Sequence, residues 1–446
     1  MRRAALLLLA LVACSSESDD PALDTEAAGT DPTVADTTQT GTGTEGDPTS
    51  ETEVGPSTET EFETTETEPS STTGPACMGK EECDDPAAPF CVAGECAPCS
   101  QVQGVAPTEA CRLNFPKTPV CAEGLCVPCS DENLGACDGD TPVCNANACV
   151  GCTYHDQCEA LGMPACDIVS GACFTEDQVL NVDVDDDIGS NDPIQDAIDL
   201  VPAGGVRVLV LTGNSTPTVN VVIDGGRRIA LKSSLDIGLR DQSDGPIVTV
   251  RGSETVAYLY RVSVRGNGDD VGIAVESGAT LYADSVRVAQ NFGGGITLAA
   301  GSSGFLRNCM VVGDGGNSSA IFSNGTLEVL FSTLGRNANF GEPVLECSGG
   351  AAMVRNSLIV NHTNTSGDEV SCAALTLENT EVKSTLTPEN WFDGFFSGSC
   401  TLTAAGQTEF ADVAIWETGD PPFDFEGDLR PNTDGASDYP GADTVP

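Results

Sequence analysis

The amino-acid sequence predicts an all-β protein whose largest part is a parallel β-helix, preceded by a small disulfide-rich repeat module and a disordered linker. Three observations indicate this architecture. The chain has 49 Gly and only 5% aromatic residues, which suits turn-rich β-structure better than a helical bundle. Sixteen cysteines lie between residues 77 and 173 in four similar units. From residue 178 onward, short apolar segments recur with a period of roughly 23–26 residues.

The N-terminus carries an export signal. A basic start, Met1-Arg2-Arg3, precedes the apolar stretch Ala4 to Ala13, which is too short to span a bilayer. The stretch ends in Leu11-Val12-Ala13-Cys14, which resembles a bacterial lipobox. That resemblance implies removal of residues 1–13 and a lipid anchor on Cys14, and Ser15 favours the outer membrane. The alternative is an ordinary secretory signal with a cysteine at its cleavage site. No later segment is long and apolar enough to be a transmembrane helix.

The composition of residues 14–76 predicts a disordered acidic tether. The segment consists mainly of Thr, Ser, Glu, Gly, Pro and Asp, and it lacks the apolar residues needed to offset chain entropy. The whole chain has 68 acidic and 19 basic residues, for a formal net charge of -49. Such a charge repels nucleic acid and anionic headgroups, so we expect no nucleic-acid partner.

Residues 77–173 form a module of four units with four cysteines each. An even cysteine count in an exported chain favours disulfides, and three connectivities remain open within a unit. Zinc is the alternative, because the CxxC pairs that join the units have metal-ligand spacing. The units are Cys77, Cys83, Cys91, Cys96; Cys99, Cys111, Cys121, Cys126; Cys129, Cys137, Cys144, Cys149; and Cys152, Cys158, Cys166, Cys173.

Turn-forming residues recur at fixed places in these units. A Pro stands two residues before each third cysteine, and Gly or Asn stands two residues before each fourth. Gly and Asn tolerate positive φ, so each unit is expected to end in a tight hairpin turn closed by its last two cysteines.

The predicted β-helix domain, 178–446, begins with a capping helix. Residues 192–199 have apolar positions at helical spacing and Asp192 as N-cap, Pro202 to Gly205 ends the helix, and 206–211 reads as a strand. Together with Asn220-Val221-Val222-Ile223-Asp224-Gly225, this start resembles pectin-lyase-like right-handed β-helices. The Tyr often found in that family's loop is missing here. The tail from Asp428 to Asp443 is similar to the ending of many bacterial β-helix repeat proteins.

The body of this domain repeats regularly. Each period holds a strand, a Gly-containing turn and a second apolar strand with Asn or Ser at a bend, as in Leu306 to Val311 and Val354 to Ile359. Such a coil buries its apolar face only against stacked neighbours. An antiparallel sandwich is the rival, but its turns would recur every 8–12 residues or so. The strands are expected to begin near Ile247, Ile273, Ile296, Ile321 and Val344.

The remaining cysteines lie within the predicted β-helix. Cys347 and Cys372 are one period apart, so stacking brings them within disulfide distance. Cys309 at an inward bend is expected to be either a buried free thiol or the partner of Cys400.

The resemblance raises the question of an active site, because enzymes with this fold cut polysaccharides. Their hydrolases use paired carboxylates, which Asp269 and Asp270 resemble loosely, but the Gly-His-Gly of that family is missing. A solvated turn is the favoured interpretation. A lyase would need a base, and three arginines are candidates if their side chains form one outward-facing column along the β-helix. Ala283, Leu330 and Glu378 interrupt this column, so an ordinary solvent-exposed face is again the favoured interpretation. These bases are Arg261, Arg307 and Arg355.

Four acidic residues ahead of the capping helix are candidate Ca²⁺ ligands. Oxygen-rich loops suit this ion, but the spacing matches no EF-hand, so we expect no cofactor. The candidates are Asp183, Asp185, Asp186 and Asp187.

The sequence therefore predicts a non-catalytic, lipid-anchored outer-membrane protein that holds a β-helix at the cell surface to bind glycan or protein. The alternative is a polysaccharide lyase or glycoside hydrolase with a diverged site. Fold analogy alone suggests carbohydrate at this point.

Overall fold

The computed structural model describes residues 77–78, 82–83, 85–130, 133, 136–185, 192–214, 216–233, 237–240, 245–268, 270–313, 318–336, 342–363 and 369–443. Every described residue belongs to the unit Thr73–Pro446. The predicted signal peptide and the whole of the predicted tether, including Cys14, lie outside the described residues. Within the described ranges, no helix combines the length and apolarity that a membrane span requires.

Each cysteine unit ends in an antiparallel hairpin. The turns use residues with positive φ, such as Ala93 (53°) with Gly94 (87°) and Ala146 (48°) with Asn147 (63°). These are the left-handed conformations that tight hairpin turns require. The predicted turn positions are therefore correct. The hairpins are β1 (Phe90–Val92) with β2 (Glu95–Ala97), β3 (Val120–Ala122) with β4 (Leu125–Val127), β5 (Val143–Asn145) with β6 (Ala148–Val150), and β7 (Cys166–Asp167) with β8 (Ala172–Cys173).

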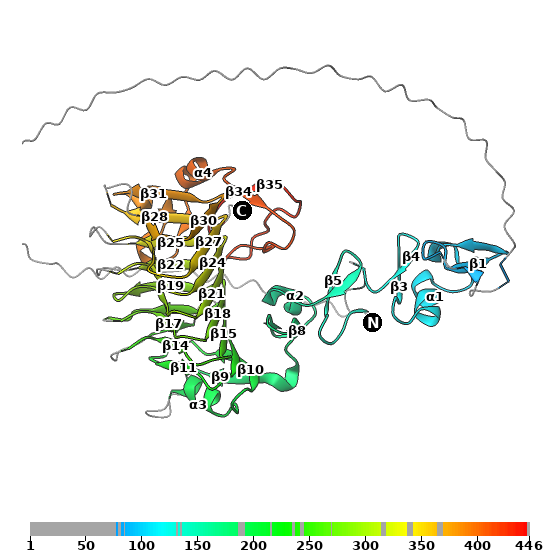
Figure 1. Ribbon diagram of the computed structural model, residues 1–446, viewed down its shortest axis with the longest axis horizontal. Coiled ribbons are helices and arrows are strands. Elements are labelled where there is room, and N and C mark those ends of the chain that lie inside the picture. Colours follow the sequence, from blue (N-terminus) through cyan, green and yellow to red (C-terminus); the bar gives the residue numbers. More distant parts are fainter. Residues whose placement is uncertain are drawn as a thin grey trace, which may run out of the picture. The chain divides into compact units, whose positions relative to one another are not determined.

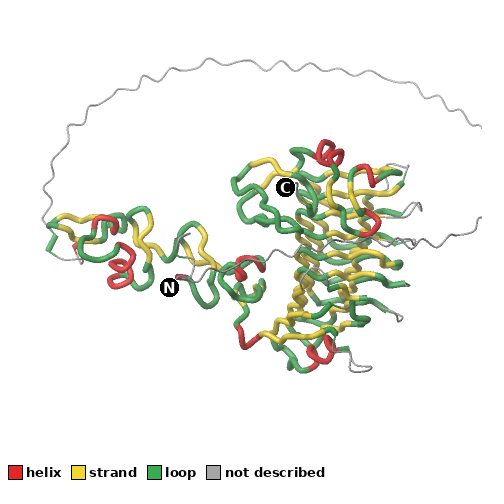
Figure 2. The backbone as a smooth tube through the Cα atoms, turned by 180° about the vertical axis from the view of Figure 1, so that it is seen from behind, coloured by secondary structure: helices red, strands yellow, loops and turns green. Residues whose placement is uncertain are grey.

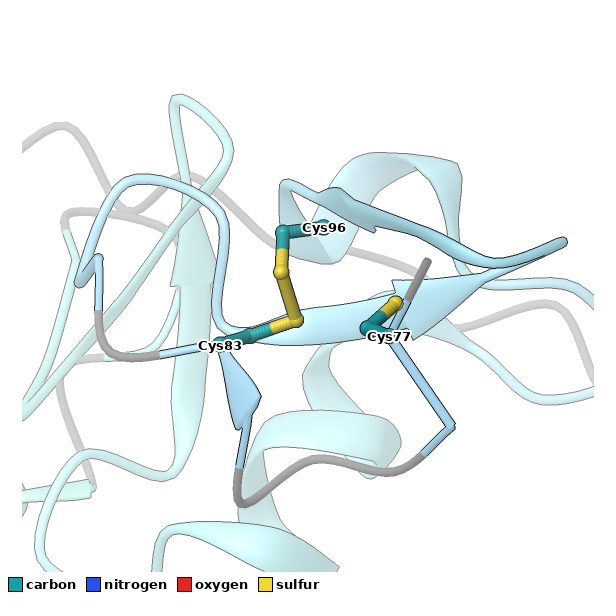
Figure 3. Close-up of side chains that lie close together, drawn as sticks. All are labelled: Cys77, Cys83 and Cys96. Carbon is teal, nitrogen blue, oxygen red and sulfur yellow. A yellow bond between two sulfur atoms is a disulfide. The ribbon is translucent and has the colours of Figure 1, made fainter. Parts of the chain in front are cut away.

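The cysteines of this module are paired in disulfides, which confirms the disulfide-rich repeats. In every unit the first cysteine bonds to the third and the second to the fourth. Figure 3 shows the bond from Cys83 to Cys96, with Cys77 beside it. The last two cysteines face each other across the hairpin but bond to earlier residues, so the expectation that they close the turn together is wrong. The bonds are Cys77–Cys91, Cys83–Cys96, Cys99–Cys121, Cys111–Cys126, Cys129–Cys144, Cys137–Cys149, Cys152–Cys166 and Cys158–Cys173.

The rest of the chain forms a parallel β-solenoid, as predicted. Figure 1 and Figure 2 show strands of successive turns stacked above one another. They form a nine-stranded sheet and two seven-stranded sheets, here called the β11 sheet and the β13 sheet, and all pairs within them are parallel. The nine-stranded sheet comprises β9 (Val179–Asp183), β10 (Val206–Thr212), β12 (Arg228–Ser233), β15 (Val256–Tyr260), β18 (Thr280–Asp284), β21 (Ser303–Arg307), β24 (Thr326–Leu330), β27 (Ala351–Arg355) and β30 (Leu375–Glu378).

The two seven-stranded sheets have shorter strands. The β11 sheet comprises β11 (Val221–Ile223), β14 (Val248–Val250), β17 (Ile273–Val275), β20 (Ile296–Leu298), β23 (Ile321–Ser323), β26 (Leu345–Cys347) and β29 (Val370–Cys372). The β13 sheet comprises β13 (Gly238–Leu239), β16 (Ser263–Arg265), β19 (Arg287–Asn291), β22 (Met310–Gly313), β25 (Thr333–Arg336), β28 (Leu358–His362) and β31 (Glu381–Thr385).

Two residues separate each strand of the nine-stranded sheet from the next strand of the β13 sheet at the corners after β15, β18, β21, β24, β27 and β30, and the first of the two has positive φ. Asn308 (φ 51°), Asn356 (φ 53°) and Asn379 (φ 46°) adopt the left-handed conformation there, which asparagine tolerates better than most residues. Each segment that reads as one bent strand in the sequence, such as 306–311, is therefore the end of one strand and the start of a strand in another sheet.

The core lies inside the solenoid and consists of inward-facing aliphatic residues stacked turn on turn. Ile223, Val250 and Val275 form part of one such column on the β11 sheet, and all three are almost fully buried. In the same sheet Cys347 lies opposite Cys372, and the two form a disulfide with a Cα separation of 4.5 Å. A stacked register therefore places these two cysteines at bonding distance, as their spacing in the sequence predicts.

A short helix closes the N-terminal end of the solenoid. Asp192 caps α3 (Pro193–Asp199) by accepting from the amides of Ile194 and Gln195, and Ile194 and Ile198 complete the core. The other α-helices are α1 (Pro107–Asn114), α2 (His155–Glu159) and α4 (Ala404–Phe410), and the 3₁₀ helices are η2 (Cys99–Gln101), η4 (Glu176–Gln178), η5 (Pro388–Asn390) and η6 (Phe395–Ser397). The C-terminal segment adds β32 (Phe392–Asp393) with β33 (Thr401–Leu402) and β34 (Ala414–Trp416) with β35 (Ala436–Asp438).

Cys309 and Cys400 are both free and buried, so the pairing considered for them is wrong. Cys309 belongs to the core inside the solenoid, next to residues such as Val311. Cys400 belongs to a separate apolar cluster, in which Phe392 and Phe410 pack against outward residues of the β13 sheet. The two thiols thus lie on opposite sides of the β13 sheet. The sheet separates them, so they cannot form a disulfide.

Candidate functional site

The carboxylate of Asp270 is used in a turn. The amide of Asp270 donates to the side-chain oxygen of Asn267 at 2.9 Å, and the amide of Val271 donates to the carboxylate of Asp270 at 2.7 Å. Asp269 lies outside the described residues. Among the described residues, no group of three metal-ligating side chains includes Asp270. The geometry therefore assigns Asp270 to the turn before β17.

The outer face of the β11 sheet carries a continuous column of side chains, one from each strand. The strand register places one outward residue of every turn in line. Only one member of this column carries a carboxylate, Glu346, and it accepts from the Ser319 hydroxyl at 3.3 Å. The column consists of Val222, Thr249, Ala274, Thr297, Phe322, Glu346 and Ser371.

The candidate lyase bases do not form one column. Arg307 and Arg355 share an outward column of the nine-stranded sheet, with Leu330 between them and Glu378 after them. Arg261 is not in it, because Tyr260 occupies that position and Arg261 forms the following corner with φ 54°. Ala283 is also misplaced in the prediction, since it points into the core and Asp284 stands in the column. The sequence alignment of the turns is one residue out of register at both positions, because Arg261 corresponds to Asn308 and Ala283 to Leu306.

Arg307 and Arg355 have structural partners. The guanidinium of Arg307 lies 2.5 Å from the carboxylate of Asp284 and 4.9 Å from the ring centroid of Tyr154. Arg355 forms an ion pair with Asp420, whose side chain is only 2% exposed. Both arginines therefore position neighbouring segments, which makes them poor candidates for proton abstraction from a substrate.

Two of the four Ca²⁺ candidates are described, Asp183 and Asp185. Their carboxylates accept hydrogen bonds from backbone amides. The amide of Asp185 donates to the Asp183 carboxylate at 3.0 Å, and the amide of Asn214 donates to the Asp185 carboxylate at 2.8 Å. Asp186 and Asp187 lie outside the described residues. The expectation that no Ca²⁺ ion binds specifically at this place therefore stays a prediction.

The fourth cysteine unit packs on the outer face of the nine-stranded sheet. Phe174 and Ala165 contact an apolar patch that includes Val208, Ala230 and Tyr258. At its edge, the Tyr258 hydroxyl donates to Asp167 and Arg228 forms an ion pair with the same carboxylate at 2.7 Å. Only 7% of the Asp167 side chain is exposed, so both partners compensate a largely buried charge.

A second group of polar contacts fixes helix α2 on the same sheet. The Tyr260 hydroxyl donates to both Asp156 and Glu159, and Lys232 pairs with Glu159. Arg261 lies 5.0 Å from the ring centroid of Tyr260 and 3.5 Å from the Asp156 carboxylate. Since one tyrosine and two basic residues next to the sheet meet two acidic residues of α2, the unit has a defined orientation on the solenoid.

His155 is fully buried in this interface. Its Nδ1 accepts the amide of Cys166 at 3.1 Å, so the proton of the neutral ring is on Nε2, which has no hydrogen-bond partner in the described part of the chain. Burial lowers the pKa of His155 to about 4. The ring is therefore neutral at pH 7 and stacks beside Tyr260, with the two centroids 4.7 Å apart.

Replacing Tyr258 with phenylalanine is expected to weaken the attachment of this unit by about 1.5–3 kcal/mol, because one hydrogen bond to a buried carboxylate is lost. Tyr282 is the matched control: it follows Tyr258 in the same outward column, and no hydrogen bond of its hydroxyl is found among the described residues. Hydrogen exchange of residues 166–173 measures the effect. Equal exchange rates in the two Phe variants would contradict the role of the Asp167 contact.

A groove lies between the cysteine module and the C-terminal segment and has a volume of about 550 Å³. One wall comes from β5, β6 and the start of the fourth unit, and the other comes from β34 and the loop that follows it. Its lining residues include Tyr154, Gln157, Trp416, Thr418, Phe423 and Asn432.

Three carboxylates of the C-terminal segment lie close together, with oxygens of Asp424, Glu426 and Asp443 within 4.8 Å of one another. Burial, followed by the charge of Asp443, raises the pKa of Glu426 to about 8. Burial also raises the pKa of Asp443. At neutral pH the pair therefore shares a proton.

Stability contributed by this shared proton is present at low pH and is lost as the pH rises through the raised pKa values toward about 8. Glu426→Gln keeps a donor for Asp443 at every pH. Because Glu426 is partly exposed and solvent screens its interaction with Asp443, the gain is limited to roughly 1 kcal/mol, and the variant should melt about 2–4 °C above the parent at pH 8.5. The exposed Glu276→Gln serves as control. Thermal melts between pH 5 and 9 test this, and a parallel pH profile for parent and E426Q would refute it.

Residues 63–179 match the model of a family described as Family of unknown function (DUF8331), a span that contains all four cysteine units and ends at the first strand of the solenoid. No curated protein matches the chain. Fold and surface together define the class: a parallel β-solenoid protein with an N-terminal disulfide-rich module.

Proposed function

We propose that this chain is a lipid-anchored surface protein of the pectin-lyase-like right-handed β-helix class that binds a glycan or protein ligand without cleaving it. The lipobox-like sequence ending at Cys14 supports attachment to the outer membrane. The nine disulfides of the described residues support an oxidising compartment.

The observation that supports a non-catalytic role is the outer face of the β11 sheet. Hydrolysis of a glycosidic bond needs two carboxyl groups roughly 5–10 Å apart on either side of the sugar. Along the described part of this face, Glu346 is the single acidic member of the outward column. The basic candidates Arg307 and Arg355 are engaged with Asp284 and Asp420. The outward column therefore lacks the second carboxylate that hydrolysis needs.

The test uses the purified full-length protein and a panel of neutral and acidic polysaccharides, with and without Ca²⁺. Binding is read by affinity electrophoresis, and cleavage is read as new reducing ends and as unsaturated uronate absorbance. We expect retarded migration on at least one polysaccharide, with no new chain ends after prolonged incubation.

Two results would overturn this proposal. Accumulation of reducing or unsaturated ends would establish a hydrolase or lyase and direct attention to Asp269 and Asp270. The proposal would also be overturned if the protein bound none of the polysaccharides and captured no protein from the surface fraction of the native cells. No ligand would then remain for a binding function.

A further inference from the structure

The groove between the cysteine module and the C-terminal segment has two walls that are held by consecutive residues of the solenoid. Arg307, at the end of β21, stacks on the ring of Tyr154 in one wall with a separation of 4.9 Å. Its neighbour Asn308 donates to the carbonyl of Phe423 in the other wall at 2.9 Å. The two consecutive residues Arg307 and Asn308 therefore fix the distance between the two walls of the groove.

The second wall has an additional support two turns further along the solenoid. The side-chain amide of Asn356 donates a hydrogen bond to the carbonyl of Ile415 at 2.8 Å. Its side-chain oxygen accepts a hydrogen bond from the backbone amide of Ile415 at 3.1 Å. Arg355 pairs with Asp420, which in turn accepts the amide of Glu417 at 2.9 Å. A segment tied down in this way keeps its shape without a ligand, which reduces the entropic cost of binding.

The lining of the groove combines apolar surface with uncharged polar groups. Apolar and aromatic side chains come from both walls, and amides and hydroxyls lie between them. The volume of about 550 Å³ is within the range of roughly 300–1,000 Å³ that is usual for small-ligand sites. The apolar members are Val143, Val150, Tyr154, Leu161, Trp416, Pro422 and Phe423, and the polar ones are Asn145, Thr153, Gln157, Thr418 and Asn432.

The charges in this lining are already compensated. Its two carboxylates are Asp156, which lies 3.5 Å from Arg261 and accepts from Tyr260, and Asp420, which is paired with Arg355. The lining contains no basic residue, and the chain as a whole carries a formal charge of -49. A charged ligand would therefore lack a counter-charge in the groove, and an anionic one would also be repelled.

We propose that this groove is the ligand site of the protein and that it takes a neutral oligosaccharide, an inference that rests on the proposed binding function. A pyranose ring presents an apolar face to aromatic side chains and a rim of hydroxyls to amides and hydroxyls, which matches the lining. A short uncharged peptide is the competing occupant, and the experiment separates the two.

Tryptophan fluorescence gives a direct readout, because the chain has only two tryptophans. Trp416 lines the groove, whereas Trp391 packs against Phe410 in the apolar cluster below the β13 sheet. In the full-length Trp391→Phe variant, Trp416 is the single emitter. Titration with neutral cello-, malto- and N-acetylchito-oligosaccharides should shift its emission saturably for at least one series.

Thr418→Arg, made in the same background, places a long side chain in the groove without disturbing the backbone amide that bonds to Asp434. It should weaken the binding of that oligosaccharide at least tenfold. Thr401→Arg is the matched control, because Thr401 is exposed on β33 and does not line the groove. This control should bind as the parent does.

The outcomes distinguish the two proposals. Binding to polysaccharide that survives in T418R, or that leaves Trp416 emission unchanged, would reject the groove while the binding function stands. Saturable binding of neutral peptides without any response to oligosaccharides would reject the saccharide assignment. Loss of polysaccharide binding in T401R to the same degree as in T418R would also reject the groove, because the effect would then be one of charge alone.

Discussion

Replacing Arg430 with methionine is expected to lower the free energy of unfolding by about 3–5 kcal/mol, the usual cost of removing one partner from a buried ion pair. The Arg430 side chain is fully buried and lies 3.0 Å from the Asp438 carboxylate. It also donates to the carbonyl of Gly441 at 2.9 Å and stacks on the ring of Phe331 at 4.1 Å. Without it, the charge of Asp438 stays buried and uncompensated.

Urea unfolding of the full-length protein measures this loss. Arg251→Met is the matched control, because Arg251 is 50% exposed and pairs with Asp224, which is 38% exposed. An exposed pair is worth at most about 1 kcal/mol, so this variant should unfold close to the parent. Similar midpoints for R430M and R251M would show that the buried arginine does not hold the C-terminal segment.

Reduction of the disulfides is expected to unfold the cysteine module while the solenoid stays folded. The eight bonds of the module close loops of 12 to 22 residues, and each contributes roughly 3 kcal/mol by loop-closure entropy. The hairpins they hold have strands of only two or three residues, and cysteines make up a large part of the buried side chains. Such a module has too small a core to fold without covalent links.

Limited proteolysis with mass spectrometry, with and without a phosphine reductant, tests this expectation. The reduced protein should lose its N-terminal part and leave a resistant fragment that begins near β9. A variant with both Cys347→Ser and Cys372→Ser should retain the module under oxidising conditions, since that bond lies within the solenoid. A module that resists protease after full reduction would refute the covalent explanation.

Several features of this fold depend on local sequence, and these could be predicted. The four hairpins follow from Gly or Asn at turn positions, such as Gly94 and Asn147 with their positive φ. The stacking of solenoid strands follows from the period of apolar segments, and the separation of 25 residues between Cys347 and Cys372 equals one turn. The strand β17 begins at Ile273, as the period predicts.

The alternation of side chains could be predicted only up to the corners. Tyr260 and Asp284 face outward in the column that the sequence assigned to Arg261 and Ala283. Arg261 is itself the corner residue and Ala283 lies one position before the column, so both were assigned one residue out of register, and a shift of one residue reverses the face. The lyase hypothesis depended on that register.

Local spacing determined the hairpins, the solenoid period and the even pairing of cysteines, because neighbours along the chain or one turn apart make those contacts. The tertiary structure alone decided which cysteines bond within a unit, how the fourth unit packs on the sheet, and where a groove forms. The deciding contacts join residues far apart in sequence: Tyr258 and Asp167 are separated by 91 residues, and Asn308 and Phe423 by 115. Such contacts arise only when the stacked turns place distant segments on one surface, so no sequence period records them.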